Sequence, residues 1–346
     1  MMQAMTVYLR PDSSFRGSRP PRSDTLFGAI CWGYQLIFDE ARLITLLNAF
    51  QPESAPFLIS SMFPYTEKDG QRSLSLPKPY TKPYQLPDKE QLDLDKLHAL
   101  KQLKKQTVVS LKDFEAMIQG AKGEECFYQD ALADVLEHKT QRYDLENACK
   151  PIKKSVTSFD VPHAAINRLT GAVEGSRFFY TEEYSPASEA QKQAGLFFFV
   201  KCREDLAADL QTVFRFLGDK GIGGGVSVGK GHFQIIEIAD ELPYREPPKA
   251  DHVVTLSLTF PCAAIRSRLS ESWYDIERRQ GKIESMYAHV EHIWKDHLVM
   301  LKEGSTFPKN GQPFYGENPI VRKDDGKSGF DVRHYGYAFT VNTRHV

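Results

Sequence analysis

Apolar and polar positions along the chain repeat with the periods of strands and of helices, and the two patterns alternate. The run LFFFV at 196–200 lacks polar positions and is typical of a buried strand, whereas apolar residues three or four apart after Asp205 indicate one face of a helix. Ser23 or Asp24 is expected to cap an earlier helix. The pattern predicts strands at 5–11, 56–65, 195–202 and 232–238 and helices at 26–38 and 205–217.

These elements follow one another as β-α-β twice, which is the order of a ferredoxin-like domain. Residues 61–150 interrupt that order. They begin with two strand-like arms around a turn at 67–70, and beyond residue 88 they are mostly helical and polar. We therefore expect an α+β fold in which an N-terminal domain covers residues 1–242 and contains an insertion at about 61–150.

A proline-rich segment marks the end of that domain. Three prolines lie within residues 243–248, and proline cannot continue a helix or a central strand. Beyond this linker, strand-like segments at 252–261, 272–283 and 332–341 flank a helical or mixed segment at 286–302. Residues 250–346 are thus predicted to form a C-terminal domain.

Composition narrows the class of protein. Of the 346 residues, 41% are hydrophobic and 26% are charged, as in a soluble globular chain. No apolar run approaches the ~18–20 residues of a membrane span, and the N-terminus lacks the pattern of a secretory signal. Five widely spaced cysteines without a CxxC pair argue against a disulfide framework or a structural zinc site. We expect a cytoplasmic protein with no membrane partner.

The net charge of −1 argues against a free-standing nucleic-acid scavenger, because such proteins are strongly basic. It leaves room for a basic groove on a chain whose other faces are acidic. Charge alone therefore does not decide whether the protein binds nucleic acid.

A glycine-rich loop at 218–231 is the most informative motif, with seven glycines in fourteen positions. Glycine lets a ligand approach the main chain, so that successive N–H groups can form an anion-binding nest, and Lys220 and Lys230 add positive charge. An inert flexible turn is the alternative, but ordering so many glycines is costly. The pattern favours contact with phosphate or nucleic acid. The candidate residues are Lys220, Gly221, Ile222, Gly223, Gly224, Gly225, Ser227, Gly229, Lys230 and Gly231.

The same loop does not fit the common nucleotide-binding motifs. Gly224 to Lys230 nearly matches a P-loop, but Gly231 stands where a P-loop has Ser or Thr. The loop also follows a predicted helix and precedes a strand, which is the reverse of the P-loop and Rossmann order. ATPase and dehydrogenase functions are therefore disfavoured.

Catalytic and metal sites are weakly indicated. The spacing HVEHIWKDH at 289–297 is not HExxH, so a solvated helix face explains its histidines better than a metal site. The pairs Asp93/Asp95 and Asp324/Asp325 fit solvated turns, and Ser227 lacks the GxSxG arrangement of a nucleophile. We predict no catalytic residue and no bound metal.

His163, Asn167 and Arg168 lie in a polar, loop-like stretch. The planar fork of Arg168 suits phosphates and bases, although Asn167 and Arg168 could equally brace a turn. His163 could also serve as the general base of a metal-independent ribonuclease.

Several segments together resemble a known family. The loop GIGGGVSVGKGHF at 221–233 is similar to that of RAMP proteins, the repeat-associated RNA-binding subunits of CRISPR systems. One RAMP subunit type fits best: the capping subunit, often called the fourth, that binds the 5′ handle in the type III-A effector, the Csm complex. The segments that resemble it are SDTLFGA (23–29), LPKPY (76–80), KQLKK (101–105), VSLKDF (109–114), HAAINRLTGAVEGSRFFYTEEY (163–184) and RHYGYAFTV (333–341).

This resemblance implies two ferredoxin-like (RRM-like) domains, no enzymatic activity and no cofactor. It implies that the chain grips the 5′ repeat handle of the crRNA and docks onto the large Palm-domain subunit and the first backbone RAMP subunit. Tyr8 and Arg10, on a predicted strand, and His163, Asn167 and Arg168 join the glycine loop as expected RNA contacts. The hairpin at 64–84 is expected to protrude as a thumb that wedges into the duplex of guide and target RNA.

Two alternatives remain at this point. The first is a RAMP endoribonuclease that processes precursor crRNA with His163 as base. The second is the related capping subunit of a type III-B or type I complex, which the 101–114 and 163–172 segments disfavour.

Overall fold

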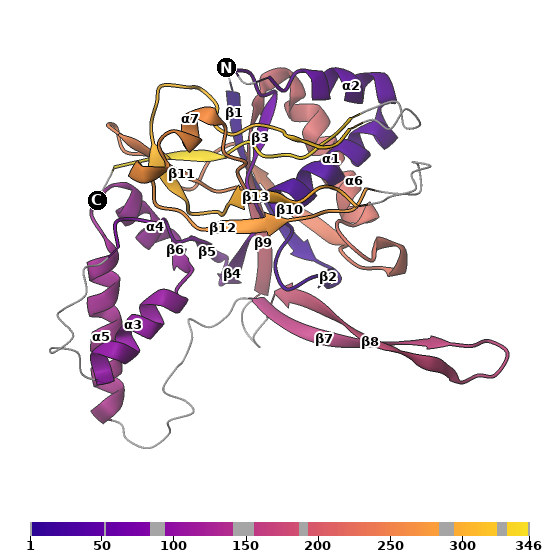
Figure 1. Cartoon of the computed structure of the whole chain (residues 1–346), viewed down its shortest axis with the longest axis horizontal. Helices are drawn as coiled ribbons and strands as arrows, with labels where there is room; N and C mark the ends of the chain where they lie inside the picture. The colour runs from indigo at the N-terminus through magenta and orange to yellow at the C-terminus, as the bar shows by residue number, and fades with distance from the viewer. Residues whose placement is uncertain are drawn as a thin grey trace. The chain divides into compact units, whose positions relative to one another are not determined.

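A computed structural model describes residues 2–51, 53–83, 94–140, 156–186, 193–283, 294–323 and 331–344. It is a mixed α/β structure with antiparallel sheets (Figure 1). The chain divides into two compact units, each assembled from separate stretches of sequence. The first contains residues 1–48, 61–73 and 154–242, and the second contains residues 49–60, 74–153 and 243–346. Segment 74–153, expected as part of an insertion in the N-terminal domain, thus groups with the second unit.

A four-stranded antiparallel arrangement forms the centre of the first unit. Its order is β10-β1-β9-β4, so the first strand in sequence lies between the third and the fourth. Apolar side chains from adjacent strands meet in register, as where Val7 faces Phe198, and both are buried because each faces packed side chains rather than water. The strands are β1 (Met2–Pro11), β4 (Phe63–Lys68), β9 (Gln193–Arg203) and β10 (Phe233–Ala239).

Two helices that pack against each other accompany this sheet, α1 (Ser23–Ile37) and α6 (Ala207–Lys220). Gly33 permits their close approach, because a Cβ there would lie 2.9 Å from a Val213 methyl. Helix α2 (Glu40–Asn48) follows α1, and the turn η2 (Glu204–Leu206) precedes α6.

The predicted side-chain cap of α1 is wrong. Arg22 occupies the cap position and makes no side-chain cap hydrogen bond. Ser23 is fully buried, and its N–H donates to Ser61 Oγ at 3.0 Å. Asp24 accepts instead from the neighbouring N–H of Thr25 at 2.8 Å. A contact from a distant segment therefore replaces the local cap.

The longest strands form a two-stranded ribbon, which Figure 1 shows as an extended arm. Strands β7 (Val156–Ile166) and β8 (Val173–Pro186) pair along most of their length, and β2 (Phe15–Arg16) joins the base of β8. His163 therefore lies in a strand and not in the loop that the sequence suggested.

The structure also corrects the prediction that the hairpin at 64–84 protrudes as a thumb. Its first arm is β4, which is hydrogen-bonded to β9 from Phe63 to Glu67 and carries the buried Tyr65. Its second arm, β5 (Gln71–Pro77), pairs with β4. Between Pro64 and Pro77 only the turn at Asp69 and Gly70 is free of the sheet, so these strands do not protrude from it.

The second unit contains a helical part. Helices α3 (Leu94–Lys105) and α5 (Glu124–Thr140) pack against each other, and the short strand β6 (Val108–Ser110) leads into α4 (Leu111–Ile118). Ser110 caps α4, because its hydroxyl accepts from the N–H of Asp113 at 3.2 Å. Strand β3 (Phe57–Ile59) also belongs to this unit.

The remainder of the second unit is built from short strands. Its three-stranded sheet has the order β14-β11-β17, and a small core around Phe307, Tyr315 and Val253 lies beside it. The predicted strands at 252–261 and 332–341 are shorter than expected, and the described part of 286–302 contains a strand and no helix. The elements are β11 (His252–Thr255), α7 (Ala263–Arg266), η4 (Leu269–Glu271), β12 (Ile276–Arg279), β13 (Leu298–Leu301), β14 (Thr306–Pro308), β15 (Ile320–Arg322), β16 (Val332–Arg333) and β17 (Thr340–Thr343).

Candidate RNA-binding site

The glycine loop begins where α6 ends at Lys220. Gly221 has a φ of +88°, which reverses the chain direction, and buried Ile222 anchors the loop to the unit. At the other end Gly231 has a φ of +75°, and a Cβ there would lie 2.1 Å from the carbonyl oxygen of Ile222. The two ends of the loop therefore touch through main-chain atoms, which only glycine permits.

Main-chain hydrogen bonds close the base of the loop but do not involve the N–H groups of its outer part, Gly223–Ser227, which we call the crown of the loop. The N–H of Ile222 donates to Gly231 O at 3.0 Å, that of Lys230 to Gly225 O at 3.1 Å, and that of Gly231 to Ser14 O at 2.9 Å. The turn η3 (Val226–Val228) lies between them. Among the described residues, no acceptor faces the N–H groups of Gly223, Gly224, Gly225, Val226 and Ser227.

Five successive unused N–H groups on a partly exposed loop are the arrangement predicted for an anion-binding nest. Gly225 and Val226 are half-buried, and main-chain donors withdrawn from water nearly always have a partner, whereas Gly223, Gly224 and Ser227 are exposed and accessible to a ligand. A phosphate oxygen is an acceptor of the correct charge for several such donors at once.

Lys230 does not extend toward a ligand as the sequence suggested. Its ammonium donates to Glu183 Oε2 at 2.7 Å and to Ser14 Oγ at 3.1 Å. The Glu183 side chain is 2% exposed, and Ser14 also donates to it at 2.5 Å. Lys230 therefore neutralises a buried carboxylate and fixes the loop to β8.

Electrostatics agree with this bracing role. Burial would raise the pKa of the Glu183 carboxyl, but the hydrogen bonds from Lys230 and Ser14 outweigh burial and lower that pKa below its usual range. Glu183 is thus held ionised at neutral pH, and Lys230 is held beside it.

Arg16 is the cation that sequence reasoning missed. It lies on β2, is exposed, and its Cδ would lie 3.0 Å from a Cβ on Gly224, which places it against the crown of the loop. Within the described residues its guanidinium has no partner, and the same holds for the ammonium of half-buried Lys220. The signal for Arg16 was its place in the arginine-rich segment 10–22, but the pairing of β2 with β8 is not visible in a sequence.

Tyr8 and Arg10 are both engaged within the first unit. Tyr8 is 8% exposed, and the Arg72 guanidinium carbon lies 4.3 Å from its ring centroid, so one ring face is covered. Burial raises the pKa of the Tyr8 hydroxyl. Arg10 donates to Gln193 Oε1 at 2.7 Å. Neither side chain lies open to a base in this structure.

His163, Asn167 and Arg168 lie along the β7–β8 ribbon. The His163 ring stacks on Phe179 at a centroid distance of 5.2 Å, and its Nε2 lies 2.7 Å from Thr181 Oγ1. Asn167 braces the turn, since its Oδ1 accepts from the N–H of Leu169 at 2.9 Å. Arg168 is exposed at the tip. The structure thus separates these residues into a stacked pair, a turn brace and an exposed cation.

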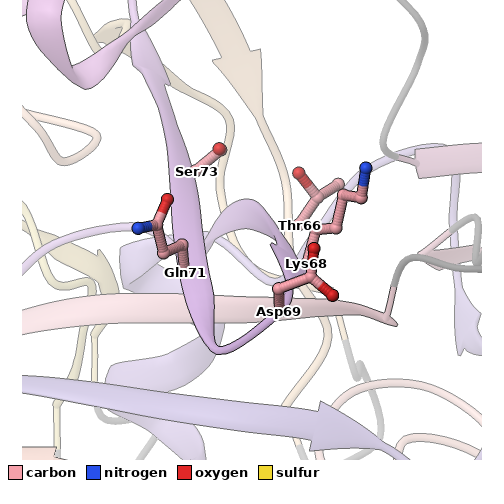
Figure 2. A pocket seen from close by; sticks show the side chains of 5 residues that line it. All are labelled: Thr66, Lys68, Asp69, Gln71 and Ser73. Carbon is pink, nitrogen blue, oxygen red and sulfur yellow. The ribbon is translucent and has the colours of Figure 1, made fainter.

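A shallow polar pocket lies at the β4–β5 turn. Thr66, Lys68, Asp69, Gln71 and Ser73 line about 430 Å³ there (Figure 2). One cation and one carboxylate offset each other in its wall, so the pocket shows no preference for an anion.

Metal-binding geometry is not found in the described part of the chain, where no three His, Cys, Asp or Glu side chains converge. His289, Glu291 and His292, Asp93, and the pair Asp324/Asp325 lie outside it. The nearby His297 accepts from Arg278 Nε at 3.0 Å. No helix of the described residues is long and apolar enough to cross a membrane.

Comparison with known proteins decides between the CRISPR subunits. Residues 248–343 match the family described as the CRISPR Csm4 C-terminal domain. A curated relative, the CRISPR system Cms protein Csm4 of Thermococcus onnurineus (strain NA1), is 27% identical over 268 residues, which are 75% of this chain and 76% of that protein. The chain is therefore similar to Csm4 proteins over three quarters of its length, and its C-terminal part matches the Csm4 C-terminal domain. Its predicted membership of the RAMP subunits of type III CRISPR complexes is confirmed.

Solved Csm4 structures share the fold. The chain is similar to the Csm3-Csm4 subcomplex of a type III-A CRISPR-Cas interference complex, with a TM-score of 0.62 at 15% identity. It is also similar to a Csm1-Csm4 cassette in complex with pppApA, with a TM-score of 0.57 at 21% identity. Each match covers 99% of both chains. Csm4 proteins are subunits of the Csm complex, and the mixed α/β architecture is that of the family.

Proposed function

We propose that this Csm4-like chain binds the 5′ repeat handle of the crRNA through its glycine loop and catalyses no reaction itself. One observation carries the proposal: the N–H groups from Gly223 to Ser227 have no acceptor among the described residues. Single-stranded RNA offers phosphate oxygens in succession, which a row of amides can hold without reading the bases. Arg16 and Lys220 would supply the charge beside that row.

The proposal includes two ferredoxin-like domains. In the first unit, the order β10-β1-β9-β4 with α1 after β1 and α6 between β9 and β10 supports it. The glycine loop then joins the second helix to the last strand. The strands of the second unit from β11 onward are short and divide among three small sheets, so its assignment rests on the family resemblance and on the matched segment 248–343.

Docking onto two protein partners is also proposed. The solved relatives pair Csm4 with Csm1 in one case and with Csm3 in another. By that analogy this chain would contact the large Palm-domain subunit and the backbone RAMP subunit of its own complex. It would also contact target RNA where target pairs with the guide.

The β7–β8 ribbon is the better candidate for the thumb. Its outer part is exposed on both faces, with Phe178 and Tyr180 on one and Phe179 on the other, each at least half exposed. An isolated two-stranded ribbon gains little stability in water, and this one presents aromatic rings that can stack on bases. We infer that it, and not the 64–84 hairpin, contacts the guide–target duplex.

Arg16→Glu tests the loop assignment. We expect crRNA per assembled complex to fall about 10-fold, because the change removes one cation and adds a repelling charge beside the nest. The melting temperature should not change, since Arg16 is exposed and has no partner to lose. Arg215→Glu, on the exposed side of α6, is the matched control and should retain crRNA. Equal retention by both variants would contradict the proposal.

The ribbon assignment predicts a different phenotype. Replacing Arg168–Gly171 with two glycines should preserve crRNA content while changing the spacing of guide and target in a complex structure. An identical guide–target path in the shortened variant would show that the ribbon is not the thumb.

His163→Ala separates the proposal from the endoribonuclease alternative. The imidazole stacks on Phe179 within a strand, which is a packing role. We expect precursor crRNA to be processed at the wild-type rate by a complex that carries this variant. Loss of processing would favour the enzyme.

A further inference from the structure

The β7–β8 ribbon, the extended arm in Figure 1, has two faces that differ in chemistry. Successive side chains of a strand point to opposite faces, and residues directly paired across two antiparallel strands share a face. One face, which we call the acidic face, carries the cross-strand pairs Asp160–Glu182, Pro162–Tyr180 and Ala164–Phe178. The other, which we call the histidine face, carries the pairs Phe159–Glu183, Val161–Thr181 and His163–Phe179.

Ring contacts agree with this division of the ribbon. Phe178 and Tyr180 lie two positions apart on β8, and their ring centroids are 5.2 Å apart, as expected for two side chains on one face. At the base of the ribbon Tyr184 continues the acidic face and stacks on Phe15 of β2 at 5.3 Å. Tyr184 is fully buried there, whereas the acidic face beyond it is exposed.

The histidine face finds partners for its polar groups within the chain. The His163 ring stacks on Phe179, and its Nε2 lies 2.7 Å from Thr181 Oγ1. The carboxylate of Glu183 is buried and paired with Lys230. No polar group of this face therefore requires a protein partner.

The acidic face differs, because its charges have no counterpart. Asp160 and Glu182 are exposed and stand directly opposite each other, an arrangement of like charges that destabilises a sheet. Among the residues that the structure describes, neither carboxylate has a cation or a hydrogen-bond donor as partner. On the same face Tyr180 is 62% exposed and Phe178 is 52% exposed. Two facing carboxylates beside two open rings suit a partner that brings positive charge and covers apolar area.

We propose that the acidic face is a docking surface for another protein subunit, which places an arginine or lysine side chain between Asp160 and Glu182 and covers the rings of Phe178 and Tyr180. A cation at this point relieves the repulsion between the two carboxylates and lies beside the Tyr180 ring, where a cation–π contact adds to the ion pairs. This assignment rests on the docking onto protein partners proposed above and is independent of the proposed RNA contacts.

RNA and metal ions fit this face less well. A base stacked on Tyr180 would bring phosphates close to two carboxylates, which repel them. In the described part of the chain no three His, Cys, Asp or Glu side chains converge, and a metal ion would leave both rings uncovered. Charge and exposed apolar area together favour a basic protein segment.

Photocrosslinking from two adjacent positions tests on which face the protein partner lies. The complex is purified after expression with its genomic neighbours and a CRISPR array, with p-benzoylphenylalanine in place of either Tyr180 or Phe179. Position 180 lies on the acidic face, and position 179 lies on the histidine face of the same strand. After irradiation we expect at least 10-fold more adduct with another protein subunit from position 180 than from position 179. Mass spectrometry then identifies the partner residues that the probe reaches.

Charge reversal tests the acidic pair in complexes that carry the probe at position 180. Glu182→Lys should lower the protein adduct about 10-fold, because it repels the cation of the partner. The new lysine faces Asp160, which is a favourable cross-strand pair, so the ribbon itself should not be weakened. Glu241→Lys, an equal reversal at an exposed glutamate of the same unit, is the matched control and should keep the adduct. Replacing the partner's crosslinked cation with glutamate should restore the adduct of Glu182→Lys.

Equal protein adducts from positions 179 and 180, or an adduct from position 180 to RNA alone, would overturn the inference. Full retention of the adduct in Glu182→Lys would equally show that the acidic pair does not select the partner. If protein subunits copurify with the chain but position 180 captures none of them, docking uses another surface and only this inference fails. If no protein copurifies, the proposed docking fails as well.

Discussion

Gly231→Ala is expected to unfold the glycine loop and abolish crRNA retention. A Cβ at this position would lie 2.1 Å from Ile222 O, and the backbone already has a φ of +75° that L-residues disfavour. The positive φ alone costs about 1–2 kcal/mol. The overlap with a main-chain oxygen cannot be relieved by a side-chain rotation, so the hydrogen bond between Ile222 and Gly231 must break as well.

A loss of roughly 3 kcal/mol would lower the melting temperature of a unit of this size by about 6–12 °C. Thermal unfolding and crRNA content of the purified complex measure the two effects. Gly229→Ala is the matched control, because its φ is +79° but nothing lies within 4 Å of the added methyl. Gly229→Ala should lose only the about 1–2 kcal/mol that the positive φ costs, and no more. Equal behaviour of the two variants would mean that the contact between the loop ends is not structural.

Lys230→Met is expected to produce the second large effect, and to act through stability rather than through direct loss of a phosphate ligand. The change leaves Glu183 buried and without its cation. Removal of one partner from a buried ion pair costs about 3–5 kcal/mol. Because Lys230 is 27% exposed, we expect a value near the lower end.

The dependence of this effect on pH follows from Glu183. In the wild type the pKa of Glu183 is lowered, so its contribution to stability is present above the pKa of the unfolded chain and is lost as pH falls through the folded value. In Lys230→Met the hydrogen bond and charge of Lys230 are gone and only the hydrogen bond from Ser14 opposes burial, so the pKa of Glu183 should rise. The difference in melting temperature between the two proteins should therefore be largest near pH 7 and shrink toward pH 4. A constant difference would show that Glu183 is not the group involved.

The Glu183→Gln/Lys230→Met double variant completes the test. With both charges removed, no carboxylate is left buried and alone, so much of the stability lost in Lys230→Met should return. Failure to recover would point to packing of the lysine chain as the cause.

The first unit was largely predictable because its residues obey strong local patterns. The run at 196–200 and the apolar face of α6 identify a buried strand and an amphipathic helix, and the density of glycine predicts that the loop is an anion-binding nest. The conformation of the loop backbone could be predicted without knowledge of distant segments, because the positive φ angles and the N–H groups without an acceptor follow from the local glycine-rich sequence.

The partners of the loop were not predictable, because they come from distant segments. Glu183 lies 47 residues from Lys230 and occupies the register position of β8 that faces Arg16. Nothing in the sequence around 230 indicates that its ammonium is already used. Arg16 was one arginine among several until β2 placed it beside Gly224.

The sequence around 176–183 is strand-like, as β8 is, but the stretch around His163 suggests a loop, for a different physical reason. Strand patterns depend on one buried face, and the outer part of β7–β8 has none, so apolar and polar residues do not alternate there. Pro162 also interrupts the segment, which is usual only in strands with an unpaired edge. The 64–84 hairpin gave the clearer signal because the inner ends of β4 and β5 are buried in the sheet, as Tyr65 and Leu76 are.

The central claim is tested most directly by sequencing the RNA that copurifies with the tagged chain when it is expressed with its genomic neighbours and a CRISPR array. The account predicts crRNA with a uniform 5′ repeat handle in the wild type and its loss in Arg16→Glu, with the handle protected from nuclease only in the former. A complex that assembles without crRNA, or that retains the handle equally in Arg16→Glu, would contradict the assignment of the glycine loop.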